Sequence, residues 1–411
     1  MGHETTGTRR SYAVFAAPLS GNKGSASMVW GLRDLLLSEG VDAELVVFSY
    51  YPDHDRRIAE AYPDITVRKG HPVHLASLLV RQVAARVLPF LANDEIRDLA
   101  RVEAAFLVGG TTFADSKLFK APWNVIAMLP AWFAGRPVHF LSQTMGPFRK
   151  PLNRRLACFA LSRADQIHGR GETSAANVRG LGFDHAVYCP DLSFGMDLDA
   201  VPDQAALDGY LAQMDAAAKD APKGLAGVTP NTIVLAAMEK TGVAYPALLA
   251  AVIEDLSARG YHPVLIPHSF RGVDKGKHNN DANLCRDILK LLPAGLATTF
   301  VDADLSSQAL RVLVGRLDLL VASRFHSMIS ALDRGVPPVT LGWGDQKYVE
   351  VLREFEAEDL YIDFSEASFA AIRDRIDHVE THRADIEARL ARGIVRARRG
   401  LRQHLTALTG R

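Results

Sequence analysis

The sequence of 411 residues has few cysteines. It contains Cys158, Cys189 and Cys285, and their spacing forms no Cys-x-x-Cys motif. So few and such widely spaced cysteines indicate neither a disulfide framework nor a zinc site. A reduced, cytoplasmic setting fits this composition best.

Long apolar runs are also missing. No stretch reaches the roughly 20 apolar residues that cross a bilayer, and the first residues lack the basic-then-apolar order of a secretory signal. We therefore expect a cytoplasmic protein without a transmembrane segment. Peripheral contact with a membrane-bound molecule, at the inner face of the membrane, stays open.

Charge of one sign is not in excess. The sequence has 47 Lys and Arg against 47 Asp and Glu, whereas a dedicated nucleic-acid protein carries a basic face. We expect small molecules and no nucleic acid as partners. With 48% hydrophobic residues, a chain of this length can build two cores of ordinary domain size.

Several catalytic signatures are absent. The sequence has no Gly-x-Ser-x-Gly elbow and no helical histidine pair of the zinc-protease type. Asp-x-Asp occurs three times, and its frequency makes it a weak metal signal. We expect neither a metal nor a cofactor.

Apolar segments of strand length alternate with helical patterns over most of the chain. In the first half a helix is predicted over Ser25–Ser38, and the predicted strands are Tyr12–Ala17, Ala43–Phe48, Phe106–Val108, Val138–Leu141 and Gln166–His168. This alternation is typical of a parallel sheet with crossover helices.

The pattern changes between Met196 and Lys223, where an Ala/Asp-rich run is typical of a surface helix within a linker. A second series follows, with strands predicted at Thr232–Ala237, His262–Pro267, Thr299–Val301, Leu319–Ala322 and Pro338–Leu341, and a helix from about Ser368 to the end. We expect an α/β protein of two Rossmann-like domains that face each other across a cleft. The predicted boundaries are 11–195 for the N-terminal domain, 196–224 for the linker, 225–365 for the C-terminal domain and 366–411 for a C-terminal helical segment.

The most informative segment is Arg324-Phe325-His326, which follows a buried-strand pattern and opens a helix ending at Gly335. Open α/β sheets bind ligands at the carboxyl ends of their strands, where helix N-termini attract anions. The helical spacing places Phe325 on a core stripe and His326 on another stripe. His326 is therefore expected to be open to a cleft.

Two glycine-containing loops follow strands of the first half. Gly21 and Asn22 lie between the first strand and the first helix, and Gly109 and Gly110 follow the strand that ends at Val108. Glycine allows close approach of the backbone to a ligand. A plain strand-to-helix turn, with Ser25 as the helix N-cap, explains the first loop equally well.

Charged and imidazole side chains follow other strands. Arg170 is expected to point into the cleft as a clamp for phosphate or carboxylate, with Ser174 capping the next helix, or else to pair with Glu172. His268 and Lys347 also lie beyond strand ends, and Asp281 is either a helix N-cap or a functional carboxylate. Arg170, Arg324, His326 and Lys347 would suit a small, doubly anionic ligand.

Taken together, these segments resemble the polysaccharide pyruvyl transferase family. The resemblance runs from about Tyr12 to Phe355, and the order and spacing of its motifs carry it: Gly21-Asn22-Lys23-Gly24, Gly109-Gly110, Gln143-Thr144-Met145-Gly146-Pro147, Arg170-x-Glu172-x-Ser174, Cys189-Pro190-Asp191-Leu192, Asp281, Ser323-Arg324-Phe325-His326, and Gly335-Val336-Pro337 with Lys347 beyond.

The resemblance implies a two-domain enzyme of the GT-B type whose N-terminal domain holds the acceptor. Such a transferase attaches the pyruvyl group of phosphoenolpyruvate as a ketal across two hydroxyls of a sugar, in a cell-surface polysaccharide, a glycolipid or their precursor. It implies functional roles for Arg170, Asp281 and His326, the last two as catalytic groups.

Two other functions remain open. The same architecture serves glycosyltransferases that use nucleotide sugars, and fold does not fix function. Ser25, Thr111 and Gly171 also depart from residues common in the family. These departures motivate the alternative of a non-catalytic member that binds an anionic metabolite, whereas the presence of Arg170, Arg324 and His326 speaks against it.

Overall fold

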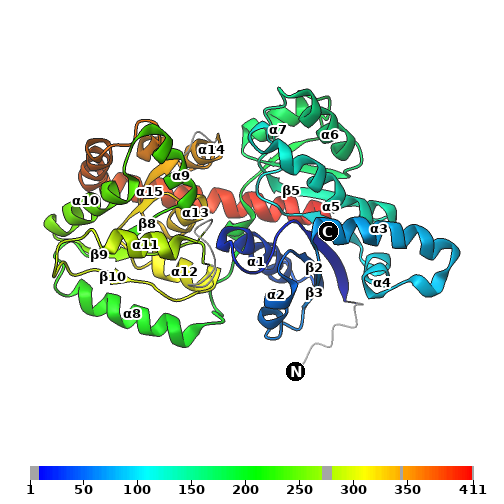
Figure 1. Ribbon diagram of the computed structural model, residues 1–411, viewed down its shortest axis with the longest axis horizontal. Coiled ribbons are helices and arrows are strands. Elements are labelled where there is room, and N and C mark those ends of the chain that lie inside the picture. The colour runs from blue at the N-terminus through cyan, green and yellow to red at the C-terminus, as the bar shows by residue number, and fades with distance from the viewer. Residues whose placement is uncertain (1–8, 271–279, 343–345, 410–411) are drawn as a thin grey trace. The chain divides into compact units, whose positions relative to one another are not determined.

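The computed structural model describes residues 9–270, 280–342 and 346–409. These residues form two compact units, shown with their elements in Figure 1. The first unit contains residues 25–196, the preceding segment up to Ser20, and the chain from Gly400 onward. The second contains residues 197–399 and the short segment Gly21–Gly24.

The first unit is built on a seven-stranded sheet in the order β3-β2-β1-β4-β5-β6-β7, with every neighbouring pair parallel. Its strands are β1 (Arg10–Phe15), β2 (Ala43–Ser49), β3 (Ile65–Lys69), β4 (Ala104–Leu107), β5 (Val138–Gln143), β6 (Gln166–Arg170) and β7 (Val187–Cys189). β4 and β5 are buried along their whole length, as expected of parallel strands covered on both faces. The direction of winding reverses between β1 and β4, so loops after these two strands meet at the switch point.

Helices cover both faces of this sheet. They are α1 (Lys23–Ser38), α2 (Pro52–Ala59), α3 (Pro72–Val87), α4 (Asp94–Arg101), α5 (Ala121–Phe133), α6 (Pro151–Leu161) and α7 (Glu172–Arg179), with short 3₁₀ turns η1 (Pro89–Leu91), η2 (Asp115–Lys120) and η3 (Leu192–Gly195). Proline opens α2, α3 and α6, where its missing N–H costs no helical hydrogen bond. Apolar side chains of β1, β4 and β5 pack with those of α3, α5 and α6 in one continuous core.

The second unit has a six-stranded parallel sheet in the order β10-β9-β8-β11-β12-β13. Its strands are β8 (Leu225–Thr229), β9 (His262–Leu265), β10 (Thr299–Phe300), β11 (Leu319–Ala322), β12 (Pro338–Gly342) and β13 (Tyr361–Asp363). The winding reverses between β8 and β11, which are hydrogen-bonded neighbours. These two strand ends define the second switch point.

The remaining helices belong largely to the second unit. They are α8 (Gln204–Ala218), α9 (Thr232–Met238), α10 (Tyr245–Ala258), α11 (Asp281–Leu289), α12 (Ser307–Val314), α13 (Phe325–Arg334), α14 (Gln346–Glu354) and α15 (Phe369–Thr409), with the turns η4 (Glu239–Thr241) and η5 (Glu358–Leu360). α15 is interrupted at His382 and contributes its last residues, from Gly400, to the first unit. None of the helices formed by the described residues combines the length and the hydropathy of a transmembrane span.

The predicted fold class is confirmed: two α/β domains with parallel sheets, followed by a C-terminal helix. The strand predicted at Thr232–Ala237 is wrong, because this segment is α9 and the strand is β8 immediately before it. The side chain of Asn231 accepts a hydrogen bond from Ile233 N and starts the helix there. The segment 196–224 carries α8, whose Leu207 and Met214 are buried.

Two predicted helix caps are also wrong. α1 begins at Lys23, so Ser25 lies inside it. The N-cap of α7 is Gly171, with a φ of 87° that favours glycine, while Ser174 Oγ accepts a hydrogen bond from Met145 N at 3.3 Å.

Candidate functional site

The switch point of the second unit is held together by buried hydrogen bonds. Asn231 follows β8 and its Nδ2 donates to Ser323 O, after β11, at 2.8 Å. Tyr245 OH donates to Ser323 Oγ at 2.7 Å, and burial raises the pKa of this phenol. Because these groups fix Ser323, the next residue, Arg324, starts α13 from a rigid position.

Arg324 forms a bidentate ion pair with Asp281. Its Nη2 lies 2.5 Å from Asp281 Oδ1 and its Nε lies 2.8 Å from Oδ2. Asp281 is fully buried, Arg324 is nearly so, and Thr232 N also donates to the carboxylate at 3.2 Å. The N-cap position of α11 belongs to Asn280, so the N-cap interpretation of Asp281 is wrong: its carboxylate binds Arg324 and the start of α9 instead.

His326 lies in the first turn of α13, half-buried, against the segment Gly21–Gly24. A Cβ on Gly24 would be 2.1 Å from His326 Nδ1, so the backbone here contacts the imidazole directly. Asn22 Oδ1 accepts from Gly24 N at 3.1 Å, and Asn22 forms an antiparallel bridge with Ser269. The first glycine loop therefore forms one wall around the histidine.

Lys23 anchors the same segment from its other side. Its carbonyl accepts a hydrogen bond from Ser307 Oγ at 2.7 Å, and its Nζ lies 2.5 Å from Asp304 Oδ1. The plain-turn interpretation of this loop is thus incomplete, because Lys23 makes long-range contacts with the start of α12 and the loop before it, and Asn22 makes one with Ser269.

His268 follows β9 and is buried. Burial lowers its pKa well below the usual value, and His326, Arg324 and Arg311 lower it further. His268 is therefore neutral at pH 7 because its surroundings are apolar and positive. The loop that follows it continues into Arg271, which lies outside the described residues.

Lys347 is a buried cation of α14. Its Nζ lies 5.3 Å from the centre of the Phe325 ring and 5.4 Å from that of Tyr348, distances at which an ammonium interacts favourably with an aromatic face. Residues 343–345, part of the motif that precedes it, lie outside the described residues.

Arg311 is a further residue near this site, and the sequence pattern does not identify it. This side chain is fully buried on α12, lies 3.3 Å from Asp333 Oδ2 through its Nη1, and adds to the positive surroundings of His268. Its sequence context, an arginine between Leu310 and Val312 in a helix, resembles any amphipathic surface helix. Only the packing of α12 against α13 reveals its position.

Gly109 and Gly110 follow the strand β4, as predicted, and this strand lies at the switch point of the first unit. A Cβ on Gly109 would be 2.9 Å from Ala16 Cβ, after β1, so this approach requires glycine. Gly110 contributes its carbonyl oxygen, which accepts from Arg170 Nη2 at 2.6 Å.

Arg170 is not free, contrary to the expectation from sequence. Its Nη1 lies 2.6 Å from Asp191 Oδ2 and its Nε donates to Thr144 Oγ1 at 3.2 Å, and the side chain is 2% exposed. In the pairing of β6 with β7, Arg170 lies opposite Cys189. Asp191, two residues after Cys189, is therefore close enough to bind the Arg170 side chain. The predicted pairing with Glu172 is wrong as well, since Glu172 pairs with Arg179.

The structure thus divides the predicted residues between the two units. Gly109, Gly110 and Arg170 belong to the first unit. The second unit brings together seven of them, at the carboxyl edge of its sheet: Gly21, Asn22, His268, Asp281, Arg324, His326 and Lys347. Among the described residues, no group of three or more His, Cys, Asp or Glu is arranged to hold a metal ion.

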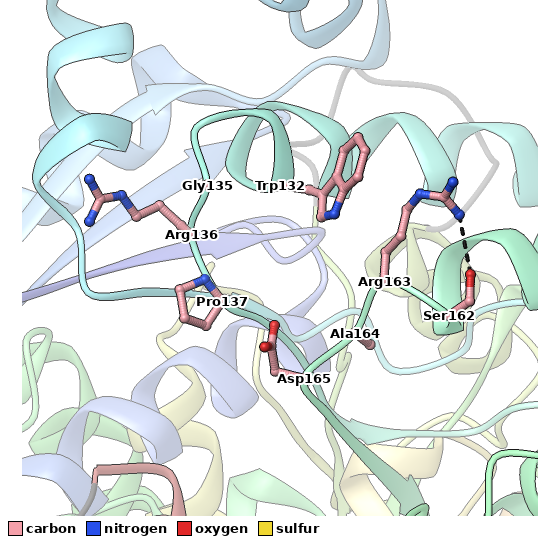
Figure 2. Close-up of a pocket in the computed structure, with 8 residues that line it drawn as sticks. All are labelled: Trp132, Gly135, Arg136, Pro137, Ser162, Arg163, Ala164 and Asp165. Carbon is pink, nitrogen blue, oxygen red and sulfur yellow. Dashed lines mark hydrogen bonds between the residues drawn. The ribbon is translucent and has the colours of Figure 1, made fainter.

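A pocket of about 430 Å³ lies elsewhere in the first unit (Figure 2). Its lining includes Arg136 and Pro137 before β5, and Ala164 and Asp165 before β6. It is therefore at the amino edge of the sheet, opposite the edge where α/β proteins bind their ligands. None of the predicted site residues lines it.

The sequence of this chain is similar to that of a known protein family. The sequence model of the family described as polysaccharide pyruvyl transferase matches residues 22–345. The amylovoran biosynthesis protein AmsJ of Erwinia amylovora is 21% identical over 408 residues, which cover 92% of this chain and 94% of AmsJ.

Solved structures of similar fold share little sequence. A UDP-GlcNAc 2-epimerase of Methanocaldococcus jannaschii has a TM-score of 0.57 at 8% identity, covering 90% of this chain and 92% of its own. The UDP-GlcNAc 2-epimerase of Neisseria meningitidis bound to UDP-GlcNAc has a TM-score of 0.56 at 10% identity, covering 93% of this chain and 94% of its own. UGT2 of Phytolacca americana has a TM-score of 0.55 at 9% identity, covering 95% of this chain and 96% of its own. These likenesses establish a GT-B-like fold.

Proposed function

The chain belongs to the polysaccharide pyruvyl transferase family, and from this premise we propose that it transfers the pyruvyl group of phosphoenolpyruvate to a sugar. Family membership makes the protein a transferase, and the AmsJ relative connects it with polysaccharide biosynthesis. In the proposed reaction the product is a pyruvate ketal on a cell-surface polysaccharide, a glycolipid or their precursor. The proposed setting is the cytoplasm.

One observation carries the proposal: the buried positive cluster around His326. Arg324 and Lys347 each expose less than a tenth of their surface, and Arg311 exposes none. Asp281 pairs with Arg324 and Asp333 with Arg311, so the two carboxylates offset part of the positive charge of the arginines. Buried cations interact more strongly with an anion than exposed ones do, because water screens them less. Phosphoenolpyruvate carries both a carboxylate and a phosphate, and these anionic groups match such a cluster in charge.

The positive surroundings of His268 support the same assignment. Three cationic or protonatable neighbours lower the pKa of this buried imidazole. The negative charge of an anionic donor bound nearby would offset the positive charge of these neighbours. His268 itself, neutral at pH 7, has one ring N–H to donate and one nitrogen to accept.

The proton balance of the reaction defines what the site must do. Two sugar hydroxyls each lose a proton and form a bond to C2 of the donor. One proton is gained at C3, which becomes a methyl group, and the other leaves with the phosphate after the C2–O bond breaks. Charge on the departing phosphate must be stabilised, a task that suits preorganised cations.

We assign His326 to proton transfer. Its imidazole is half-buried and lies at a helix N-terminus, and histidine is the side chain that most often moves protons near neutral pH. Asp281 orients the guanidinium of Arg324 by binding both its Nε and its Nη2. We assign Arg324, together with Lys347, to binding the anionic groups of the donor. Asp281 therefore acts mainly as a positioning residue in this scheme.

Calorimetric titration with phosphoenolpyruvate, followed by assays of phosphate release, tests the proposal. His326→Gln should bind the donor as the wild type does and lose about 10²–10⁴ in turnover, whereas Lys347→Met should lose donor affinity. His54→Gln, an exposed histidine of α2, is the matched control. Turnover at the wild-type rate in His326→Gln would remove this residue from the mechanism.

The rival functions give different results in the same experiment. Binding of a nucleotide sugar in place of phosphoenolpyruvate would make the protein a glycosyltransferase. Phosphoenolpyruvate binding without turnover on a broad panel of sugar and glycolipid acceptors would favour a non-catalytic family member. Mass spectrometry of the acceptor distinguishes ketal formation from hydrolysis of the donor.

A further inference from the structure

The helices α3, α5 and α6 form a continuous layer over one face of the sheet in the first unit (Figure 1). Gln82 Nε2 of α3 donates to Pro130 O of α5 at 3.0 Å, which ties the two helices together. We call this layer, with η1 and η2, the α3–α5–α6 layer. Its inner side belongs to the core described above, and its outer side has an unusual composition.

Large apolar side chains are concentrated on this outer side. Val80, Val87, Phe90 and Phe119 expose 72%, 80%, 79% and 71% of their surface, respectively. In α3 the buried residues include Leu75, Leu78 and Gln82. The exposed Val73, Val80 and Val87 recur every seven residues on another side, so the helix is apolar on two sides. Clusters of this kind mark interaction sites, whereas isolated exposed apolar residues do not.

The same layer carries more positive than negative charge: its helices α3, α5 and α6 contain no Asp or Glu, and Asp115, the first residue of η2, is its one acid. Residues 65–93 contain four Lys or Arg and residues 116–164 contain eight, and neither segment contains Asp or Glu. The whole chain contains 47 Lys and Arg and 47 Asp and Glu, so its acidic residues are concentrated outside these two segments. The acidic residues that flank these segments in sequence are Asp64, Asp94, Asp115 and Asp165.

Cations and aromatic rings also alternate at the C-terminal ends of α5 and α6. The Arg163 guanidinium lies 3.8 Å from the centre of the Phe159 ring and 5.1 Å from that of Trp132. Figure 2 shows Trp132 and Arg163 beside the pocket, with Arg136 at its other side. Tryptophan and arginine side chains of this kind are suited to the boundary between water and acyl chains.

We propose that the outer side of the α3–α5–α6 layer is a peripheral binding surface for an anionic lipid bilayer. Its exposed valines and phenylalanines insert among the acyl chains, and its lysines and arginines contact the lipid phosphates. A surface that combines apolar side chains with an excess of cations over acids is complementary to a bilayer in both respects. The proposal does not depend on pyruvyl transfer, since it is tested without any substrate.

Cosedimentation of the full chain with vesicles tests the proposal. Vesicles of phosphatidylcholine with about 40% phosphatidylglycerol should bind the protein, and pure phosphatidylcholine should bind it far less. Raising the salt concentration should weaken binding, because lipid charges are screened. Insertion should shift the emission of Trp123 and Trp132, each 43% exposed, toward the blue.

Two sets of variants separate the contributions. Val80→Ser with Phe90→Ser should reduce partitioning at least tenfold, since burying one large apolar side chain has an effect of this size. Arg81→Gln with Arg155→Gln should reduce it by about fivefold for each cation removed. The matched control is Leu291→Ser, an equally apolar side chain, 52% exposed, in the second unit. Circular dichroism and melting temperature confirm that each variant is folded.

Three results would overturn the proposal. The first is the absence of binding to the anionic vesicles, and the second is binding that both double variants retain in full. The third is self-association of the wild type in buffer that Val80→Ser with Phe90→Ser abolishes, because the layer would then be an interface between copies of this chain.

Discussion

Gly24 lies directly against His326, with room for no side chain between them: a Cβ on Gly24 would be 2.1 Å from the imidazole Nδ1. The requirement for glycine here is steric, since the contact itself leaves no space for a methyl group. The first loop of the chain and the histidine after β11 are therefore interdependent. Movement of either one displaces the other.

Gly24→Ala should displace the His326 ring and lower turnover by about 10²-fold, because a shift of about 1 Å in a positioned group has an effect of this size. Phosphate release and the melting temperature are measured together. Gly209→Ala is the control, because a Cβ at that helical position meets nothing within 4 Å. Wild-type turnover in Gly24→Ala would show that the position of His326 is not critical.

Asp281→Ala should lower the free energy of unfolding by about 3–5 kcal/mol, because it leaves the nearly buried Arg324 without its carboxylate. Asp281→Asn keeps the shape and one oxygen acceptor and should lose less. Urea denaturation measures both. Asp287→Asn, on the same helix but in the exposed pair with Lys290, should change stability by less than about 1 kcal/mol.

The two Asp281 variants also distinguish positioning from proton transfer. A positioning role predicts weaker donor binding in both variants, with the pH profile of turnover unchanged in shape. Loss of one limb of that profile in Asp281→Asn, with donor affinity intact, would identify the carboxylate as a base.

Much of the fold is predictable because it depends on local patterns. Leu319–Ala322 is a short, continuously apolar segment between polar residues, and it forms β11 with the predicted bounds. The helix boundary at Thr232 was missed because Thr232-Ile233-Val234 has strand-like composition, yet Asn231 caps it as a helix. β13 was missed for a different reason, since three residues beside a longer strand leave too little pattern.

The candidate site is predictable only in part, since many of its contacts join residues far apart in sequence. Strand-end positions identify His326, Arg324 and Lys347 as candidates. They do not reveal that Asp281 pairs with Arg324 or that Arg170 pairs with Asp191, because both pairs form through tertiary structure.

His168→Phe should make the protein less sensitive to acid. Burial lowers the pKa of His168 to about 3, with further lowering by His404 and His139, whereas the unfolded value is about 6.5. Between these values the unfolded state binds the extra proton, so stability falls as the pH falls below about 6.5. From pH 7.5 to pH 5 this residue alone accounts for about 2 kcal/mol.

Urea denaturation at pH 7.5, 6.5 and 5 measures this effect. The loss between pH 7.5 and pH 5 should be about 2 kcal/mol smaller in His168→Phe than in the wild type. His71→Phe, at an exposed position before α3, should lose as much as the wild type does. An equal loss in His168→Phe would mean that His168 is protonated in the folded state above pH 5.

Arg170→Met should destabilise the first unit by about 3–5 kcal/mol, because it leaves the fully buried Asp191 without its cation. Adding Asp191→Asn should recover part of that loss, since the remaining group is then neutral, and a double-mutant cycle gives the coupling between the two. Unfolding free energy and phosphoenolpyruvate affinity are measured on all three variants. If Arg170→Met keeps wild-type stability and loses donor binding, Arg170 is a ligand clamp after all. The structural role predicts the reverse, because the guanidinium already binds Asp191, Thr144 and the carbonyl of Gly110.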